Sequence, residues 1–365
     1  MKILGIDTSC DDTCISVIKA QSSKFKTQNF EILSNIVSSQ VKLHAKYGGV
    51  YPALAKREHI KNLPLVFRQA TKGIKPSEID LISVTNGPGL EPCLWQGVNF
   101  ARDLAKKLKK PLIPINHIEA HIIANFINLK SEIPAPYRNK VSGAGFNLKS
   151  IFSAVCLVVS GGHTQLILMK GIGQYKLISE TRDDAAGECF DKVARILGLG
   201  YPGGPIVAKS ATQFQISNFK FKIVLPRPMM YQKNYDFSFS GLKTAVLYKV
   251  QSMKSKETKK KEFIRAMCAE TQQAIIDVLI HKTIKAAKDF KVKSIILGGG
   301  VAANDELRKQ FNLKIKNLKL KINFLVPPKN LCTDNAAMIA AVAYFSKREA
   351  NRDFEKIKVD ANLKI

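Results

Sequence analysis

Two stretches of the chain place apolar runs on either side of a short polar turn. Near the start, ILGID and CISVI (residues 3–7 and 14–18) flank the turn TSCDDT. Residues 154–169 repeat the arrangement as AVCLVV, SGGHT and QLILM. Short apolar runs around a tight tip of Ser, Thr, Asp or Gly are typical of β-hairpins. We therefore predict a hairpin at each place.

A second pair of segments combines an apolar run, a glycine turn and a helical pattern. Residues 81–105 read as a strand (LISVT), the turn NGPG and a helix, and residues 294–310 read as a strand (SIIL), the turn GGG and a helix. Backbone N–H groups at such a helix start can accommodate anions. One such unit is common in α/β proteins. Two ordered pairs predict a duplicated α/β fold, with two similar lobes facing each other across a cleft.

Polar stretches separate and follow these units. Residues 128–150 contain Pro, Gly and Ser without clear periodicity, and they mark the expected junction between the lobes. The basic run at 250–262 is typical of solvated surface leading into a helix. We expect the tail after about Asn351 to be peripheral.

Composition narrows the class of protein. The chain has 45% hydrophobic and 24% charged residues, as ordinary globular proteins do. Its longest apolar stretch, Ala154 to Ser160, is too short for a bilayer, and its first residues lack a basic-then-apolar leader, so we predict a cytoplasmic protein. The seven cysteines are scattered, with no CxxC pair and no zinc-ligand cluster. We predict reduced, mostly buried thiols.

The net charge of +28 is compatible with a phosphate-rich partner, of which nucleic acid is the obvious candidate. However, 46 of the 57 basic residues are Lys and only 11 are Arg, as codon composition alone could produce. Specific phosphate and base recognition usually uses Arg as well. Charge alone therefore leaves both explanations open.

The motif HIEAH places His117 and His121 four residues apart, so both imidazoles leave one helix face and can bind one metal ion. It is not HExxH, and the general base of zinc proteases is therefore missing. A bare HxxxH is weak evidence and needs a third ligand. Asp334 precedes a helix of small residues, where it could serve either as that ligand or as an N-cap.

Two further segments could bind a ligand. SGGHT lacks the Lys of a P-loop, but its glycines can present backbone N–H groups to phosphate. Residues 183–191 contain Asp183, Asp184, Glu188 and Asp191 ahead of a Pro-Gly-Gly turn. These carboxylates suggest metal, ribose or hydroxyl binding, and ordinary charge at a helix start explains them equally well.

Ten motifs occur together and in order over roughly residues 1–345, and they resemble the bacterial TsaD family, the tRNA N6-adenosine threonylcarbamoyltransferases. The motifs are GIDTSCDDT, SQVKLHAKYGGVYPALAKREH, NGPGL, HIEAH, LVVSGGHTQLI, DDAAGECFDKVARILGLGYPGGP, PRPM, DFSFSGLKTAV, GGGVAANDELR and CTDNAAMIAA.

The resemblance implies a fold of the actin, Hsp70 and sugar-kinase type (RNase H-like), with two duplicated lobes around a central cleft. We accordingly expect an N-terminal lobe at 1–135 that carries HIEAH. A C-terminal lobe at 136–365 would carry the adenylate pocket, with its last helices packing back on the first lobe. The implied reaction moves a threonylcarbamoyl group from threonylcarbamoyl-adenylate to N6 of adenosine 37, in tRNAs reading codons that begin with A.

The resemblance also implies site residues and partners. The metal ion, iron or zinc (Fe²⁺ or Zn²⁺), would be held by His117, His121 and Asp334. The adenylate pocket would be lined by Val158, Val159, Ser160, Gly161, Gly162, Asp191, Gly204 and Asn304. No general base is evident, and the candidates are Asp11, Asp12 and Glu188. Besides tRNA, we expect a TsaB-like paralogue and a TsaE-like ATPase as partners, and no membrane.

The chain departs from the family pattern in two places. Asp12 stands where members commonly carry Glu, and after NGPGL the family often has small residues where this chain has Glu91, Pro92, Cys93 and Trp95. The second difference bears on a helix that packs against the partner or the other lobe in relatives. Partner pairing is therefore less firmly implied than ligand binding.

Three other functions compete with this one. A small-molecule kinase or ATPase of the same superfamily would use the hairpin tips and the GGG turn equally well. It would leave the HIEAH motif and the Cys-Thr-Asp sequence that ends at Asp334 without a purpose. A metallopeptidase would need a Glu base beside the histidines. A non-catalytic scaffold could bind tRNA or a partner subunit, and it would not depend on His121 for any chemistry.

Overall fold

The computed structural model describes residues 1–22, 28–127, 150–214, 223–253, 258, 261–351 and 353–365. The expected lobe junction at 128–150, apart from residue 150, and part of the basic run at 250–262 therefore lie outside the described residues. Among those that are described, all seven cysteines are free, and all except Cys10 are buried. No helix in the described part of the chain is both long and apolar enough to cross a membrane.

The first lobe contains a five-stranded sheet in the order β3-β2-β1-β4-β5. β1 and β2 form the predicted antiparallel hairpin, and β3 continues the antiparallel meander. β4 then pairs parallel to β1, and β5 pairs parallel to β4. The strands are β1 (Lys2–Asp7), β2 (Asp12–Ser22), β3 (Gln28–Ser39), β4 (Leu81–Gly87) and β5 (Leu112–Asn116).

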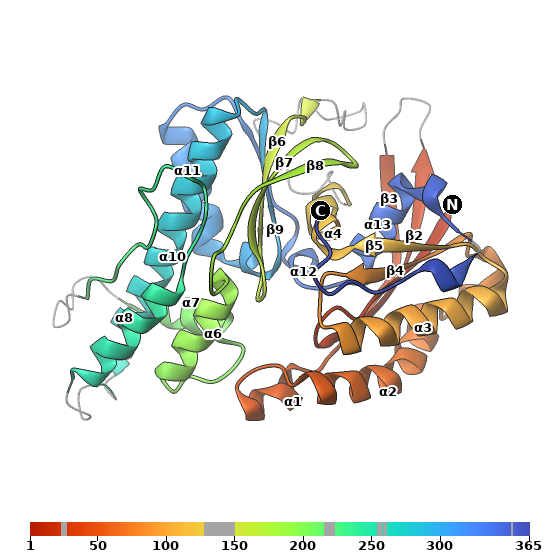
Figure 1. The fold of residues 1–365 in the computed structure, drawn as a ribbon, viewed down its shortest axis with the longest axis horizontal. Helices are drawn as coiled ribbons and strands as arrows, with labels where there is room; N and C mark the ends of the chain where they lie inside the picture. Colours follow the sequence, from red (N-terminus) through yellow and green to blue (C-terminus); the bar gives the residue numbers. More distant parts are fainter. Residues whose placement is uncertain (23–27, 128–149, 215–222, 254–257, 259–260, 352) are drawn as a thin grey trace.

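The second lobe repeats this topology in the order β10-β9-β6-β7-β8. β6, β7 and β8 form the antiparallel meander, while β9 and β10 add to its first strand in parallel. The duplicated α/β fold with two lobes is confirmed (Figure 1). The strands are β6 (Ala154–Val159), β7 (Thr164–Gly171), β8 (Gln174–Glu180), β9 (Ser294–Gly298) and β10 (Asn323–Leu325).

Helices cover the outer face of each sheet, and each cover encloses its own apolar core. In the first lobe, Val66 and Val98 pack against strand residues such as Ile6. The covering helices there are α2 (Pro52–Ala70) and α3 (Glu91–Leu108), and α2 follows the short α1 (Val41–His44). In the second lobe they are α6 (Ala186–Ile196), α7 (Gly203–Thr212), α8 (Ser240–Gln251), α10 (Lys261–Asp289) and α11 (Asp305–Asn317).

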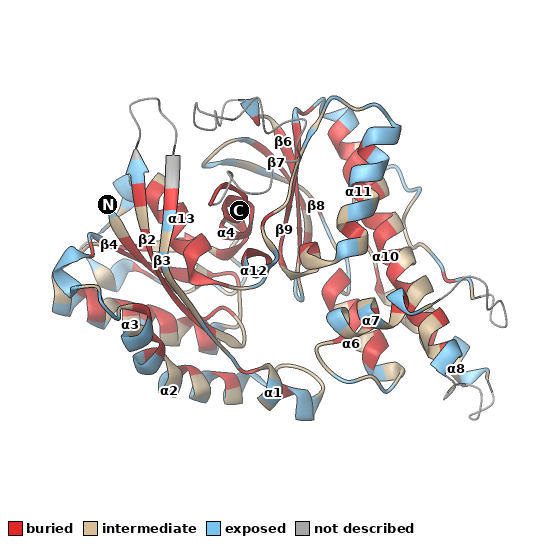
Figure 2. Cartoon of the chain, turned by 180° about the vertical axis from the view of Figure 1, so that it is seen from behind, coloured by how far each residue is buried: buried red, intermediate tan, exposed pale blue. Residues whose placement is uncertain are grey.

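A third apolar core joins the two sheets through α4 (His117–Ile123) and α13 (Ala336–Phe345). Figure 2 shows buried residues in both sheets and in these two helices between them. Two glycines permit the close packing. A Cβ on Gly5 would lie 2.2 Å from the Ala336 carbonyl of α13, and one on Gly298 would lie 2.7 Å from the His121 carbonyl of α4. The late helix α13 thus packs on the first strand of the chain.

The C-terminal tail lies on the surface of the first lobe, where all of its described residues except Ile357 are exposed or half-buried, and it is attached there at several points. Asn351 pairs antiparallel with Leu112 of β5. Further on, the Asp360 N–H donates to the Asn86 carbonyl (2.9 Å), and the Asn116 amide donates to the Lys364 carbonyl (3.2 Å). The tail is held by these main-chain hydrogen bonds and by apolar packing, since Ile357 is buried in the core of the first lobe.

Candidate metal centre and cleft

The helix α4 presents the two histidines. Asn116 caps its start, because the side-chain oxygen accepts hydrogen bonds from the backbone N–H groups of Ile118 (2.8 Å) and Glu119 (3.1 Å). His117 and His121 follow one turn apart, with ring centroids separated by 4.6 Å, and both are buried. The HIEAH spacing therefore has the predicted geometry.

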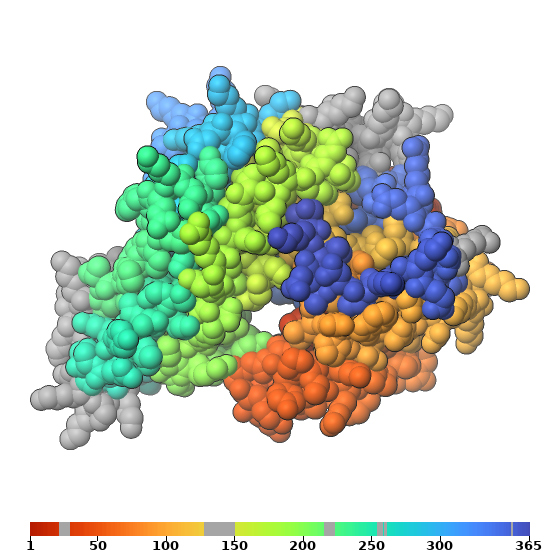
Figure 3. Space-filling model, in the orientation of Figure 1, coloured from red at the N-terminus to blue at the C-terminus, as the bar shows by residue number. Residues whose placement is uncertain are grey.

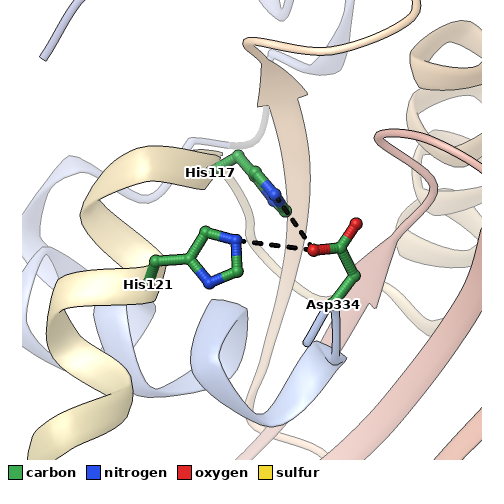
Figure 4. Close-up of side chains that lie close together, drawn as sticks. All are labelled: His117, His121 and Asp334. Atoms are coloured by element: carbon green, nitrogen blue, oxygen red, sulfur yellow. Dashed lines mark ion pairs between the residues drawn. The ribbon is translucent and has the colours of Figure 1, made fainter. Parts of the chain in front are cut away.

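Asp334 reaches the histidines from the loop between α12 (Lys329–Cys332) and α13. It is not the N-cap of α13, since the Asn335 side chain accepts the hydrogen bond from the Met338 N–H (3.1 Å). One Asp334 carboxylate oxygen lies 3.4 Å from Nε2 of His117 and 3.4 Å from Nε2 of His121 (Figure 4). Ligand atoms of the three residues lie within 4.8 Å of one another, so the group can hold one metal ion.

A fourth residue, Asp7, supports this group and was missed in the sequence. Its carboxylate ends β1 and lies 3.4 Å from Nδ1 of His117, the nitrogen that does not face Asp334. Its other oxygen accepts a hydrogen bond from the Ser9 N–H (3.1 Å). A carboxylate on the second imidazole nitrogen is the usual support of a metal-binding histidine. The only sequence signal was an Asp at the end of an apolar strand beside a polar tip.

The charges in this centre are strongly coupled. Burial opposes protonation of His117, but Asp7 and Asp334 outweigh it and raise the pKa of His117 to about 10. Burial lowers the pKa of His121. The pKa of Asp334 is lowered, because the two histidines outweigh the effect of its burial.

The centre also contains buried polar atoms that have no hydrogen-bond partner among the described residues. These buried atoms are Oδ2 of Asp7, Nδ1 of His117, and both ring nitrogens of His121. Two of them, Oδ2 of Asp7 and Nδ1 of His117, face each other at 3.4 Å as an ion pair. Each such atom costs about 1–3 kcal/mol when nothing compensates it. Nε2 of His121 is a candidate ligand atom among them, and it lies beside an Asp334 oxygen that also faces Nε2 of His117. A buried imidazole nitrogen with a free lone pair in this group fits a bound divalent cation. Glu119 does not belong to the group, so the residue between the histidines supplies no peptidase-type base beside them.

The tip of the first hairpin places two carboxylates near this centre. Burial raises the pKa of Asp12 to about 7, and the neighbouring charges of Asp334 and Asp11 add to the effect. Burial also raises the pKa of Asp11. His59 holds the tip from α2, with its ring nitrogens 2.8 Å from the Thr13 hydroxyl and 2.9 Å from the Cys10 carbonyl.

The tip of the second hairpin is open rather than charged. A Cβ on Gly161 or Gly162 would meet nothing within 4 Å. The turn is closed by a hydrogen bond from the Ser160 N–H to the His163 carbonyl (2.8 Å). Burial, together with the nearby charges of His117 and His121, lowers the pKa of His163 to about 4. This glycine tip therefore lies within electrostatic range of the metal centre.

Three of the four carboxylates at 183–191 have structural partners. Asp183 accepts hydrogen bonds from the hydroxyls of Ser238 and Ser240 and from the Phe239 N–H. Asp184 pairs with Lys192 (2.7 Å) and Lys243 (2.9 Å). Glu188 pairs with Lys192 (2.8 Å) and accepts from the Ala185 N–H at the start of α6 (3.3 Å).

The fourth carboxylate, Asp191, lies near the first lobe, since burial and the charge of Asp11 raise its pKa. It accepts a hydrogen bond from the Gly203 N–H (2.7 Å), and a Cβ on the next residue, Gly204, would meet nothing within 4 Å. Tyr201 in this turn has a raised pKa, caused first by burial and then by the nearby charges of Asp11 and Asp191. The second lobe thus comes close to the acidic tip of the first.

The side chains of the remaining candidate residues, Val158, Val159 and Asn304, have structural roles. Val158 and Val159 are buried in β6, so they can offer a ligand only their main chain. Asn304 caps α11 by accepting from the Leu307 N–H (3.0 Å), and its amide donates to Gln272 (2.9 Å). Figure 3 shows the surface hollowed between the two lobes.

Comparison with known proteins places the chain in a family. Residues 31–145 and 140–341 match the TsaD family, described as tRNA N6-adenosine threonylcarbamoyltransferase. The Thermosipho africanus enzyme of that name is 44% identical over 100% of both chains, and that of Thermomicrobium roseum is 42% identical over 100% of this chain and 97% of its own. YeaZ from Pseudomonas aeruginosa is a solved structure with 15% identity and a TM-score of 0.27. It covers 48% of this chain and 65% of its own, a likeness too slight to bear on fold or function. The full-length matches show that the chain belongs to the TsaD family of tRNA N6-adenosine threonylcarbamoyltransferases.

Proposed function

We propose that this transferase moves a threonylcarbamoyl group from threonylcarbamoyl-adenylate to N6 of adenosine 37, in tRNAs reading codons that begin with A. The observation that carries the proposal is the His117–His121–Asp334 group beside two hairpin tips of different chemistry. In the reaction a bond forms between N6 and the carbonyl carbon, the bond to the phosphate oxygen breaks, and AMP leaves. A proton is lost from N6.

The residues proposed to hold the metal ion are His117, His121 and Asp334. Their two nitrogens and one oxygen suit Fe²⁺ and Zn²⁺ alike. When bound, such an ion supplies Lewis-acid polarisation of a carbonyl. Asp7 orients the His117 ring by facing its second nitrogen, so that Nε2 points towards Asp334.

The second hairpin tip is proposed to hold the adenylate. Main-chain N–H groups of Gly161 and Gly162 can approach its phosphate, because these residues place no Cβ in the way, whereas the Ser160 N–H is bonded to the His163 carbonyl. Asp191 is proposed to accept a ribose hydroxyl beside Gly204. The contribution proposed for Asn304 is to fix the start of α11, since its side chain is bonded to Gln272 and to the Leu307 N–H. Held in this way, the carbonyl carbon is oriented for attack.

The first hairpin tip is proposed to receive the proton from N6. Adenine N6 is a poor nucleophile, because its lone pair is delocalised into the ring, so loss of the proton must accompany attack. A pKa of about 7 lets Asp12 accept a proton near neutrality. Asp11 is the second candidate, whereas Glu188 is weaker because it is already paired with Lys192.

The cellular setting follows from the substrate. We propose that the protein acts in the cytoplasm, together with a TsaB-like paralogue and a TsaE-like ATPase. We also retain the division into lobes at 1–135 and 136–365, with α13 and the tail returning to the first lobe.

The test is mass spectrometry of tRNA nucleosides. Unmodified tRNA is incubated with the protein, its partners and threonylcarbamoyl-adenylate, and a parallel sample receives ATP and a candidate metabolite instead. The proposal predicts threonylcarbamoyl-adenosine in the first sample only. Phosphorylated metabolite without any modified nucleoside would support a kinase and contradict the proposal.

A further inference from the structure

Two exposed tyrosines stack on each other in the segment between α1 and α2. Tyr47 and Tyr51 are 61% and 55% exposed, and their rings lie 5.7 Å apart between centroids at an interplanar angle of 28°. Tyrosine rings usually bury their faces against apolar neighbours. A stacked pair that leaves more than half of each side chain in solvent therefore offers ring surface to a partner.

The charge around this pair is of one sign. Residues 40–57 contain no Asp or Glu. The exposed basic side chains in this segment are Lys42, Lys46, Lys56 and Arg57. None of these four forms an ion pair within the part of the chain that the structure describes, so their charge is available to phosphates.

The segment is anchored to the candidate site. The Gln40 N–H donates to the Asp11 carbonyl (3.1 Å), and the buried His44 bonds to the Gln40 side chain (3.1 Å) and to the Tyr51 N–H (3.3 Å). On the far side, the Arg195 guanidinium of α6 donates to the Gly48 carbonyl. The tyrosine segment therefore lies where the two lobes meet, and it is connected to the first tip through Gln40 and His44. Figure 1 shows α1, which leads into this segment, at the lower edge of the first lobe, with α6 of the second lobe beside it.

We propose that Tyr47 and Tyr51 form a stacking platform for an unpaired nucleotide of the tRNA loop next to the target adenosine, with the four basic side chains on the adjoining phosphates. This inference rests on the proposed function. A base inside a stacked loop cannot present N6 to a buried centre, so it must leave the stack and its neighbours lose their contacts. Aromatic side chains beside cationic ones replace such contacts in proteins that bind single strands.

The platform is tested by tRNA binding to the full chain with its partner proteins present. The probe is an unmodified tRNA with 2-aminopurine beside the target adenosine. The double variant Tyr47→Ala/Tyr51→Ala should bind at least about 10-fold more weakly and should lose the stacking-dependent quenching of the probe. Tyr47→Phe/Tyr51→Phe keeps both rings and should bind like the wild type. Tyr248→Ala, at a 65% exposed tyrosine on α8 beside Lys249, is the matched control and should change nothing.

Salt dependence separates the rings from the charges. The tyrosine variants should keep the wild-type slope of affinity against salt, whereas Lys42→Ala/Lys46→Ala should reduce that slope by about one for each lysine. Wild-type tRNA affinity in the double alanine variant would overturn the platform. A second result would also overturn the platform. If the double alanine variant no longer binds a partner protein, but binds tRNA normally in the absence of partners, this surface is a protein-docking site. A wild type that binds tRNA but yields no modified nucleoside would contradict the proposed function instead.

Discussion

The two hairpin tips occupy equivalent places in sheets of identical topology, yet their chemistry is opposite. The tip between β1 and β2 carries Asp11 and Asp12, whose pKa values are raised by burial. The tip between β6 and β7 carries Gly161 and Gly162, which face open space and have no charge. Duplication has therefore preserved position without preserving chemistry. A carboxylate tip suits proton acceptance, and a glycine tip suits the approach of a phosphate.

The metal ligands belong to neither tip. His117 and His121 lie on α4, and Asp334 immediately precedes α13, and both helices pack in the layer between the sheets. The centre is thereby placed within electrostatic range of both tips, as the pKa shifts of Asp12 and His163 indicate. The comparison predicts that changes at the metal centre stop the reaction. Changes at the first tip should impair proton acceptance, and changes at the second tip should impair binding of the adenylate.

The largest effect is expected at Asp334. Asp334→Ala should abolish transfer and metal binding, because a buried pair of histidines then lacks its carboxylate ligand. The neighbouring Asn335→Ala is the control. It removes the N-cap of α13 and should cost about 1 kcal/mol of stability while keeping the metal. Metal content, transfer rate and Tm distinguish the two variants. Full metal occupancy in Asp334→Ala would refute the assignment.

The acidic tip should determine the pH dependence. Because protonated Asp12 cannot accept the N6 proton, the rate should fall as pH drops through about 7. Asp12→Asn should remove this acid limb and slow transfer by about 10²- to 10⁴-fold. Glu188→Gln should keep the limb, since Glu188 is paired with Lys192. An unchanged pH–rate profile in Asp12→Asn would exclude this carboxyl as the proton acceptor.

A smaller effect is expected at Asp7. Asp7→Asn preserves the size of the side chain but removes the charge beside Nδ1 of His117. Metal affinity, measured by competition with a chelator, should fall by about 10- to 100-fold. The matched Asp80→Asn alters the carboxylate that accepts from the Lys2 N–H at the other end of β1, and it should bind metal normally. If Asp7→Asn bound the metal as tightly as Asp80→Asn does, Asp7 would have no role at the metal centre.

The smallest effect is expected at the glycine tip. Gly161→Ala meets no protein atom, so it should leave Tm unchanged and raise the KM for the adenylate, by about 10-fold if one phosphate contact is lost. Gly187→Ala is the contrasting variant. Its Cβ would lie 2.5 Å from the Ser160 carbonyl, and it should destabilise the fold by about 1–3 kcal/mol. A normal KM in Gly161→Ala would argue against phosphate binding at this tip.

Local patterns were sufficient for the hairpins, the glycine turns and the two-lobed arrangement. Contacts between distant segments were not predictable in the same way. Asp334 could have been an N-cap until the structure placed Asn335 in that role. Asp7 has no sequence neighbour that reveals its contact with His117.

For two segments the structure adds partners that the sequence left open. The carboxylates at 183–191 suggested a ligand site, but Asp183, Asp184 and Glu188 mostly hold their own segment together. Their residue types and spacing suit either use, and only their partners distinguish the two. The tail after Asn351 has six apolar residues among fourteen, and Ile357 is buried in the core of the first lobe. Which part of the molecule they pack against, and the main-chain hydrogen bonds of the tail to the first lobe, could not be read from the hydrophobic pattern.

The most direct test of the account compares the wild type with His121→Ala in the conversion of tRNA adenosine, measured by nucleoside mass spectrometry at matched tRNA occupancy. The account predicts that the wild type forms threonylcarbamoyl-adenosine, and that the variant forms none while binding tRNA nearly as well. Equal conversion by the two proteins would contradict the role of the metal centre in the transfer.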